Sequence, residues 1–203
     1  MRRLLLSFAA LLCAAVATAA PALAGTAPTC PKAVYEQPFL RWLDPMSYVL
    51  VPNGTFEAGA TGWALRGGAS VVSENEPFYV HGKRETKSLS LPAGSSATTS
   101  QMCVNLLRPD LRLFAVNRGS LLSTLKVEVL VPGLLGGTMA LPVAVPVLAT
   151  SSWQPTLPLP FVVNALAPLS PSGNMLVAFR FTPQGAGGAW AIDDVYLDPY
   201  KGR

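Results

Sequence analysis

Apolar and polar residues alternate along several segments of this chain, as they do in β-strands with one buried face. In residues 125–131 ("LKVEVLV"), apolar residues occupy every second position and are separated by Lys126 and Glu128. Residues 175–182 ("MLVAFRFT") repeat the pattern around Arg180. Further strands are predicted at residues 70–73, 88–92, 96–104, 138–149, 157–163 and 189–197.

Short clusters of Gly, Pro, Asn and Ser separate these segments, as expected of tight turns. Residues 106–117 begin like a helix, but Pro109 interrupts it and alternating apolar positions follow. The five prolines between residues 138 and 160 cannot all lie in a central strand, because proline has no N–H to donate, so edge strands or loops are expected there. The pattern predicts an all-β fold, an antiparallel β-sandwich or barrel of about eight to ten strands.

The first 24 residues have the features of an export signal. Two arginines precede a long run of Leu, Ala, Phe and Val that ends in Ala22-Leu23-Ala24, which matches a secretory signal cleaved before Gly25. No later segment approaches 18 uninterrupted apolar residues, so no membrane anchor is expected. We therefore expect a signal peptide at residues 1–24, an N-terminal segment at 25–50 and one secreted domain at 51–203.

The N-terminal segment is rich in aromatic residues. Tyr35, Phe39, Trp42 and Tyr48 fall within fourteen positions, and two prolines interrupt this stretch. We interpret residues 25–50 as a segment that wraps the sandwich and covers sheet edges. The alternative is an exposed aromatic strip that binds a ligand.

Charge gives no support to nucleic-acid binding. The formal charge of +4 includes Arg2 and Arg3, so that it falls to about +2 once the signal is removed. No run of Lys or Arg forms a phosphate-binding stripe. Charged residues make up only 13% of the chain, against 17 glycines and 19 prolines, which favours short strands and turns over helices.

Two cysteines remain after removal of the signal, which contains Cys13. In an oxidising compartment an even pair predicts a disulfide between Cys30 and Cys103. Closure of this 73-residue loop would stabilise the fold by roughly 4 kcal/mol. A metal or redox pair is disfavoured, since there is no CxxC spacing and the chain has one histidine.

Three motifs resemble those of galactose-binding-like jelly rolls, the fold of many carbohydrate-binding modules. They are "NGTFEAGATGW" at residues 53–63, "KSLSLPAG" at 87–94 and "WAIDDVYL" at 190–197. They occur in the family's order and span most of the sequence after the signal. The chain also resembles a group of small secreted actinobacterial proteins of unassigned function. The resemblance implies a jelly-roll fold, but it does not transfer an activity.

The adjacent carboxylates Asp193 and Asp194 suggest a metal site. In the jelly rolls that this chain resembles, a structural Ca²⁺ commonly lies where the first and last strands meet, which implies Glu57 and Asp193 as ligands. By period 2, Asp193 shares a face with apolar residues, where an unpaired carboxylate would be costly, whereas Asp194 is expected to remain solvated or to cap a turn. The alternative is that Arg180 or Lys87 pairs with Asp193.

Catalysis is not expected. A Ser-His-Asp arrangement would have to use His81, and no G-x-S-x-G elbow occurs in the chain. A histidine-based zinc site needs more imidazoles than one. No pair of acidic residues lies in a recognisable glycosidase context.

Binding is the favoured function. Sugar sites combine flat aromatic rings with placed polar groups, and the predicted carbohydrate-binding residues are Phe78, Tyr79, His81 and Trp153. Trp63 and Trp190 are expected in the core. The sequence thus predicts a secreted module that binds a polysaccharide or cell-wall glycan. The alternatives are an adhesion protein that binds a protein partner through residues 138–160, and a subunit of a separately encoded enzyme.

Overall fold

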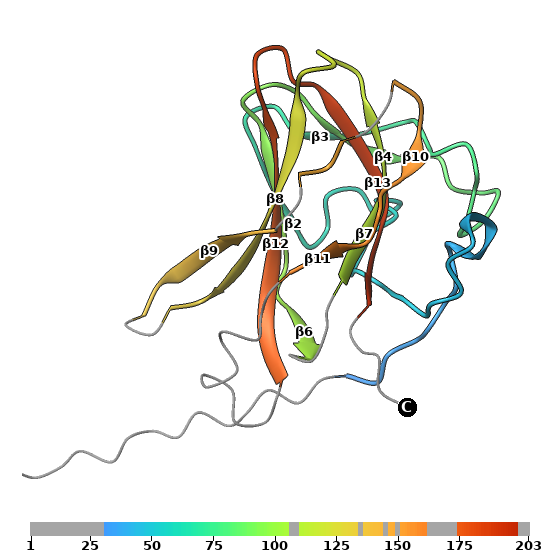
Figure 1. The fold of residues 1–203 in the computed structure, drawn as a ribbon, viewed down its shortest axis with the longest axis vertical. Helices are drawn as coiled ribbons and strands as arrows, with labels where there is room; N and C mark the ends of the chain where they lie inside the picture. The colour runs from blue at the N-terminus through green and yellow to red at the C-terminus, as the bar shows by residue number, and fades with distance from the viewer. Residues whose placement is uncertain are drawn as a thin grey trace, which may run out of the picture.

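The structure is a computed structural model that describes residues 31–105, 110–133, 136–143, 146–148, 151–161 and 174–198. These residues form two antiparallel β-sheets packed face to face (Figure 1), with one short 3₁₀-helix, η1 (Leu40–Trp42). The predicted all-β antiparallel β-sandwich is confirmed.

Each sheet combines strands that are distant in the sequence. The seven-stranded sheet has the order β10 (Gln154–Pro155), β7 (Asp110–Asn117), β13 (Trp190–Asp198), β4 (Ser88–Leu91) and β3 (Ser70–Val72), while β1 (Val49–Leu50) pairs with β13 and β11 (Leu159–Pro160) with β7. The six-stranded sheet has the order β2 (Trp63–Arg66), β5 (Ser96–Thr99), β12 (Asn174–Gln184), β8 (Thr124–Pro132) and β9 (Thr138–Pro142), and β6 (Met102–Asn105) pairs with β12.

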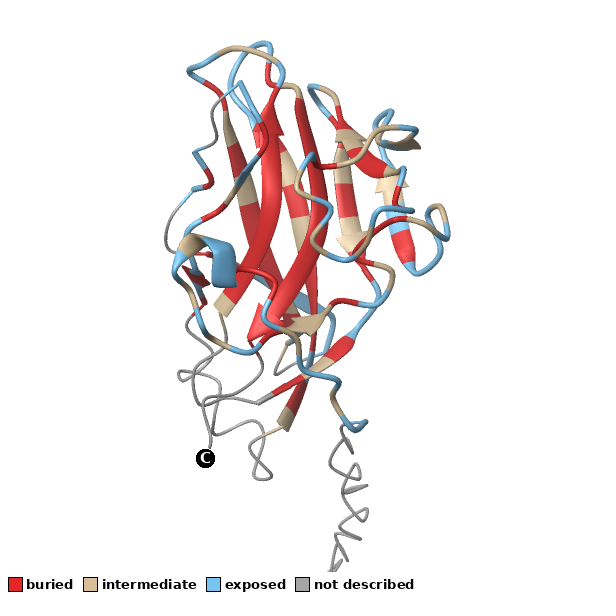
Figure 2. Ribbon diagram, turned by 90° about the vertical axis from the view of Figure 1, so that its right-hand side faces the viewer, coloured by how far each residue is buried: buried red, intermediate tan, exposed pale blue. Residues whose placement is uncertain are grey.

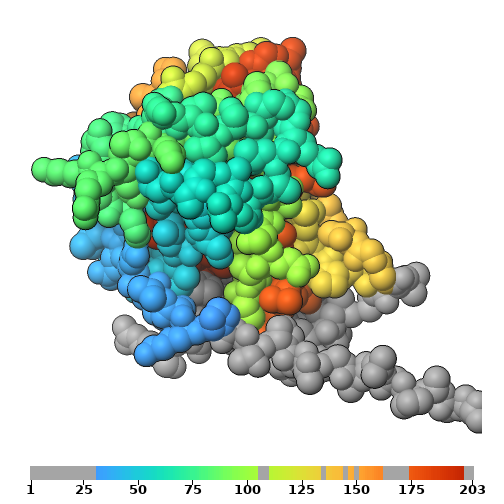
Figure 3. All heavy atoms as spheres, turned by 180° about the vertical axis from the view of Figure 1, so that it is seen from behind, coloured from blue at the N-terminus to red at the C-terminus, as the bar shows by residue number. Residues whose placement is uncertain are grey.

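The two clearest alternating segments are neighbours in the six-stranded sheet. Arg180 of β12 lies opposite Glu128 of β8, and the two side chains form an ion pair on the outer face. The proline-rich region 138–160 supplies the outermost strand β9 and the two-residue strands β10 and β11, which agrees with the prediction of edge strands. β9 projects from one side of the sandwich (Figures 1 and 3).

The main core lies between the sheets and is mostly aliphatic. Its fully buried side chains include Leu89, Leu113, Val177 and the rings of Phe179 and Phe181. The expectation that Trp63 and Trp190 belong to the core is confirmed, since both lie in this cluster. Burial of such side chains is the main favourable contribution to folding.

A second hydrophobic cluster lies on the outer face of the seven-stranded sheet. It contains Phe39 and Tyr48 of the N-terminal segment together with Phe114, Trp153 and Tyr196. Because it covers this face, the central strands β7 and β13 are buried along almost their whole length (Figure 2). Strands buried on both faces lose the apolar–polar alternation, which explains why residues 106–117 gave a weak strand signal.

Polar contacts fasten the N-terminal segment to the sheet. Arg112 of β7 forms a buried ion pair with Asp44, donates from Nε to the carbonyl of Thr156 at 2.7 Å and lies 4.1 Å from the centroid of the Phe39 ring. The hydroxyl of Tyr48 donates to Asp44 at 2.7 Å. The described part of the segment therefore forms part of the packed structure.

Several sequence predictions fall outside the described residues. They include the signal peptide at residues 1–24 and Cys30. Cys103 lies in β6 and is engaged in a disulfide, and its pairing with Cys30 stays a prediction. Within the described ranges, no helix is long and apolar enough to cross a membrane.

Candidate functional site

A β-bulge in β13 explains the two adjacent aspartates. Asp193 pairs with Phe114 of β7, but the next pair is Tyr196 with Arg112, so β13 contains one extra residue at this point. Asp194 adopts a left-handed backbone conformation with φ 46°, which Asp tolerates better than most residues.

The bulge reverses the alternation of β13. Before the bulge Trp190 and Ile192 face the main core, and after it Val195 and Leu197 do so. An unbroken period of two predicts that Asp193 shares its face with Ala191, Val195 and Leu197, and this prediction is wrong for Val195 and Leu197, which face the main core. The expectation that Asp194 stays solvated is also wrong, since this residue is 1% exposed.

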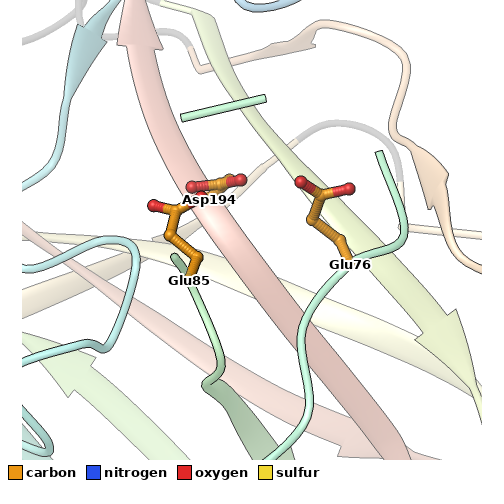
Figure 4. Close-up of side chains that lie close together, drawn as sticks. All are labelled: Glu76, Glu85 and Asp194. Atoms are coloured by element: carbon orange, nitrogen blue, oxygen red, sulfur yellow. The ribbon is translucent and has the colours of Figure 1, made fainter. Parts of the chain in front are cut away.

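Asp194 belongs to a cluster of carboxylates with Glu76 and Glu85. These three residues, which we call the carboxylate cluster, each offer a carboxylate oxygen within 4.8 Å of the others. Glu76 and Glu85 come from the β3–β4 loop (residues 73–87), and their carboxyl groups approach Asp194 across β13 (Figure 4). Glu76 is 0% exposed and Glu85 is 8% exposed.

The hydrogen bonds around the cluster are unevenly distributed. The Glu76 carboxylate accepts from the N–H groups of Phe78 and Val80, the latter at 2.8 Å. Asp193 accepts from the N–H of Glu76 at 3.1 Å and from that of Asp194 at 2.9 Å. Among the described residues, the four carboxylate oxygens of Glu85 and Asp194 have no hydrogen-bond partner.

Burial in this environment raises the pKa of the acidic groups. Desolvation raises the pKa of Asp194 to about 9, and the neighbouring charges of Asp193, Glu85 and Glu76 add to the effect. Desolvation likewise raises the pKa of Asp193 to about 8 and that of Glu85 to about 7. Without a cation, the raised pKa values of Asp193 and Asp194 therefore favour the protonated form of these two carboxyl groups at neutral pH.

Neither Glu57 nor Asp193, the predicted ligand pair, belongs to the carboxylate cluster. Glu57 Oε1 accepts from the backbone N–H groups of Thr86 and Lys87 at 2.7 and 2.8 Å, so it anchors the end of the β3–β4 loop. The Lys87 ammonium donates to the Glu57 carbonyl, and Arg180 pairs with Glu128. The proposed alternative partners of Asp193 are thus engaged elsewhere.

Two of the predicted sugar-binding rings are unavailable or half-buried. Trp153 is 8% exposed within the outer cluster, and its Nε1 donates to Glu74 at 3.2 Å, so the expectation of an exposed ring is wrong. Phe78 packs edge-on against Trp42 with ring centroids 4.9 Å apart. The N-terminal segment, which provides Trp42, packs against Phe78 and Trp153, although the sequence around these two residues suggested exposed loops.

The other two predicted residues lie at the surface. Tyr79 is 46% exposed and has φ 50°. His81 Nδ1 lies 3.3 Å from both the Tyr196 hydroxyl and Glu36 Oε2. The same hydroxyl donates to Glu36 at 3.0 Å. His81 therefore joins the β3–β4 loop to the N-terminal segment.

A partly open cavity of about 820 Å³ lies beside His81. It is lined by residues 31–36, 49–52 and 101–103 together with His81, Asn174, Leu176 and Leu197. Tyr35, which is 52% exposed, supplies an aromatic ring, and Glu36, Gln101 and Asn174 supply polar groups. The sequence signals for this cavity were the predicted binding residue His81 and the aromatic content of the N-terminal segment, whereas Gln101 and Asn174 belong to no motif.

Comparison with known proteins supports the fold. No protein-family model matches this sequence, and no curated protein matches it. The CBM22-1 xylan-binding domain of Paenibacillus barcinonensis Xyn10C is similar in structure, with a TM-score of 0.50 and 19% identity over 74% of this chain and 94% of that one. The CBM22-1–GH10 modules of Clostridium thermocellum xylanase 10B are also similar in structure, with a TM-score of 0.52 and 16% sequence identity. The similarity covers 75% of this chain and 29% of that one. The predicted jelly-roll fold is confirmed.

Proposed function

We propose that this protein is a secreted, non-catalytic module that binds a polysaccharide. The observation that carries the proposal is the cavity beside His81, whose largely apolar lining includes the exposed residue Tyr35 and the polar residues Glu36, Gln101 and Asn174. A jelly-roll fold shared with a xylan-binding domain supports the same class of ligand. The signal-like sequence at residues 1–24 supports secretion.

The chemistry of the cavity suits a sugar chain. A volume of about 820 Å³ lies within the usual range of ligand pockets and can hold a short oligosaccharide. The ring of Tyr35 offers an apolar face to sugar C–H groups, while Glu36, His81 and Gln101 can form hydrogen bonds with hydroxyl groups. The floor includes apolar residues such as Val51 and Met102, which exclude water from the contact.

The position of the acidic groups supports a role without hydrolysis. A glycosidase needs two carboxylates that flank the bond of a bound sugar. Asp193, Asp194 and Glu76 are each at most 1% exposed, so these three carboxyl groups are not accessible to a sugar. The bound polysaccharide would leave the protein unchanged.

The first test compares two exposed tyrosines. We expect Tyr35→Ala to weaken polysaccharide binding at least tenfold, which corresponds to about 1.4 kcal/mol, because it removes the aromatic face of the cavity. Tyr79→Ala is the matched control, since Tyr79 is similarly exposed but does not line the cavity. Binding would be measured by affinity electrophoresis and pull-down on xylan, other insoluble polysaccharides and purified bacterial cell wall.

The outcome of this comparison shows whether the cavity or the β3–β4 loop binds the polysaccharide. Loss of binding in Tyr79→Ala, with full binding in Tyr35→Ala, would contradict the cavity and restore the loop residues predicted from the sequence. If the wild-type protein bound none of the polymers, carbohydrate binding itself would be rejected.

A second candidate function is the binding of a protein partner through β9. This strand is the outermost strand of its sheet, it projects from the body of the molecule (Figure 1), and Met139 on it is 37% exposed. An exposed strand edge can accept a strand from another protein. A wild-type protein that binds none of the polymers would favour this function.

A further inference from the structure

We propose that the carboxylate cluster of Glu76, Glu85 and Asp194 binds one Ca²⁺ ion that fastens the β3–β4 loop to the bulge of β13. This site differs from the pair expected from the sequence motifs, because Glu76 and Glu85 lie outside those motifs. The proposal does not depend on carbohydrate binding.

The negative charge of the carboxylate cluster is not paired with any Lys or Arg among the described residues. Three carboxylates, all at most 8% exposed, converge on one point (Figure 4), and Asp193 lies next to them. Within the described ranges, the ion pairs of Lys and Arg involve other acids, namely Asp44, Glu74 and Glu128. Burial of unpaired carboxylates is highly unfavourable, so a bound cation would remove a large cost.

Several carboxylate oxygens of the cluster also lack hydrogen-bond partners. Both oxygens of Asp194 and both oxygens of Glu85 are buried, and among the described residues none of them forms a hydrogen bond of ordinary geometry. The carboxyl group of Glu76 and the N–H of Gly82 are the groups that lie near Asp194 and Glu85, respectively. Buried polar atoms in native proteins are nearly always satisfied. Four such atoms on side chains that point toward one another indicate that a ligand of positive charge belongs between them.

The kind of donor selects the metal. All three side chains offer hard carboxylate oxygens, and the cluster contains neither imidazole nor thiolate. Ca²⁺ takes six to eight oxygen ligands and accepts bidentate carboxylates, whereas zinc prefers nitrogen and sulfur. Glu85 and Asp194 can each offer two oxygens, Glu76 can add at least one, and water molecules can complete the shell.

The neighbouring Asp193 acts as a positioning residue. Its carboxylate accepts from the N–H groups of Glu76 and Asp194, and thereby holds the backbone of two proposed ligands. The bulge allows both aspartates to lie on the side of β13 that the β3–β4 loop covers. In an unbroken strand, consecutive side chains would point to opposite faces of the sheet. The doubled aspartate thus supplies one ligand and one group that orients the ligands.

Calcium binding would also affect the residues of the loop that lie between the two glutamates. Phe78, Tyr79 and His81 lie between Glu76 and Glu85, and His81 lines the cavity. A bound ion would hold both ends of this segment against β13. The protein without Ca²⁺ would lack this link at the edge of the cavity.

The test is a titration of the full secreted chain after treatment with EDTA and removal of the chelator. We expect isothermal titration calorimetry with CaCl₂ to show one site per chain, with a Kd no weaker than about 1 mM, the upper end of the range for extracellular modules. At a hundredfold excess of Ca²⁺ over Kd, the Tm should rise by about 5–10 °C.

Three variants locate the site. Glu85→Gln and Asp194→Asn remove a charge with little change of shape and should abolish both the heat signal and the Tm shift. Glu57→Gln is the matched control and should retain both, because Glu57 caps the backbone of Thr86 and Lys87. Folding of each variant would be checked by circular dichroism.

A measurement on the wild-type protein covers the case of a variant that does not fold. Ca²⁺ should slow amide hydrogen exchange in residues 73–87 and around Asp194. The proposal would be overturned by a folded wild-type protein that shows no binding up to about 100 mM CaCl₂. It would also be overturned by protection confined to other residues, or by binding that survives in both Glu85→Gln and Asp194→Asn.

Discussion

The outer faces of the two sheets are built in opposite ways. The seven-stranded sheet is covered by the N-terminal segment and the β3–β4 loop, which place aromatic rings and buried carboxylates against it. The strands of the six-stranded sheet direct their aromatic residues Trp63, Phe179 and Phe181 inward, and their outer face carries the ion pairs of Glu128 with Lys126 and Arg180. One face is therefore a second core, and the other is a charged surface.

Acidic residues on the two faces differ in how their charge is compensated. Burial opposes the ionisation of Glu128, but hydrogen bonds from Arg180 and Lys126 outweigh it and lower the pKa. Asp193 accepts hydrogen bonds from backbone N–H groups only, and Asp194 has no Lys or Arg partner among the described residues. Burial therefore raises the pKa of both aspartates. The comparison shows that a partner, and not burial alone, decides the direction of the shift.

This difference predicts opposite pH dependence, which is the largest expected effect. A carboxyl group with a raised pKa stabilises the folded state below its unfolded value of 3.8, and this contribution is lost as the pH rises through about 8 for Asp193 and about 9 for Asp194. A shift from 3.8 to about 8 corresponds to roughly 6 kcal/mol. In EDTA, the free energy of unfolding should therefore fall between pH 5 and pH 9.

Urea denaturation of wild type and Asp194→Asn at both pH values would measure this effect. The stability advantage of the variant over the wild type should be small near pH 5 and much larger near pH 9, since the variant has no proton to lose. Glu128→Gln should show the reverse dependence, with a cost at neutral pH that disappears in acid as Glu128 is protonated. A wild-type stability that is equal at pH 5 and pH 9 in EDTA would contradict the uncompensated burial of the aspartates.

A truncation in each cluster tests whether the outer one is a genuine core. Phe179 is 0% exposed between the sheets, and Phe39 is 0% exposed beneath the N-terminal segment, where its ring lies 5.5 Å from that of Phe114. We expect Phe179→Ala and Phe39→Ala each to cost about 3–5 kcal/mol of unfolding free energy. If Phe39→Ala costs less than about 1 kcal/mol, the segment is only a loosely attached cover.

The ion pair on the covered face should contribute more to the free energy of unfolding than the ion pair on the charged face, although both effects are smaller than those above. Arg112 is 5% exposed, and Arg112→Met would leave the charge of Asp44 without its cation, at a cost of about 3 kcal/mol. The side chain of Arg180 is 37% exposed, so Arg180→Met should cost less than about 1 kcal/mol. Chemical denaturation would measure both, and equal costs would contradict the comparison.

Several features of the fold could be read directly from local patterns. The alternation in residues 125–131 and 175–182 predicted two strands that are neighbours in the sheet, and the prolines of 138–160 predicted edge strands. These predictions succeeded because side-chain direction in a strand repeats every two residues. The same rule failed at Asp194, where one extra residue shifts the register of β13.

The residues of the candidate sites were harder to predict from the sequence. Trp153 lies in a polar, loop-like context, and its burial depends on the outer cluster, to which Phe39 and Tyr48 contribute from more than a hundred residues earlier. Tyr35 was recognisable only as one of several aromatic residues in the N-terminal segment. No local pattern indicated that Gln101 and Asn174 line the same cavity as His81.

The sequence by itself determined the all-β class and the edge position of the proline-rich strands, because these depend on local periodicity and on proline chemistry. The core position of Trp63 and Trp190 was implied by the jelly-roll motifs in which both residues lie. Only the tertiary structure decided which carboxylates meet. The hydrogen bond between Glu76 and Asp193 joins residues 117 positions apart. Such a contact is set by how the β3–β4 loop closes over the last strand, and no local pattern of residues encodes that geometry.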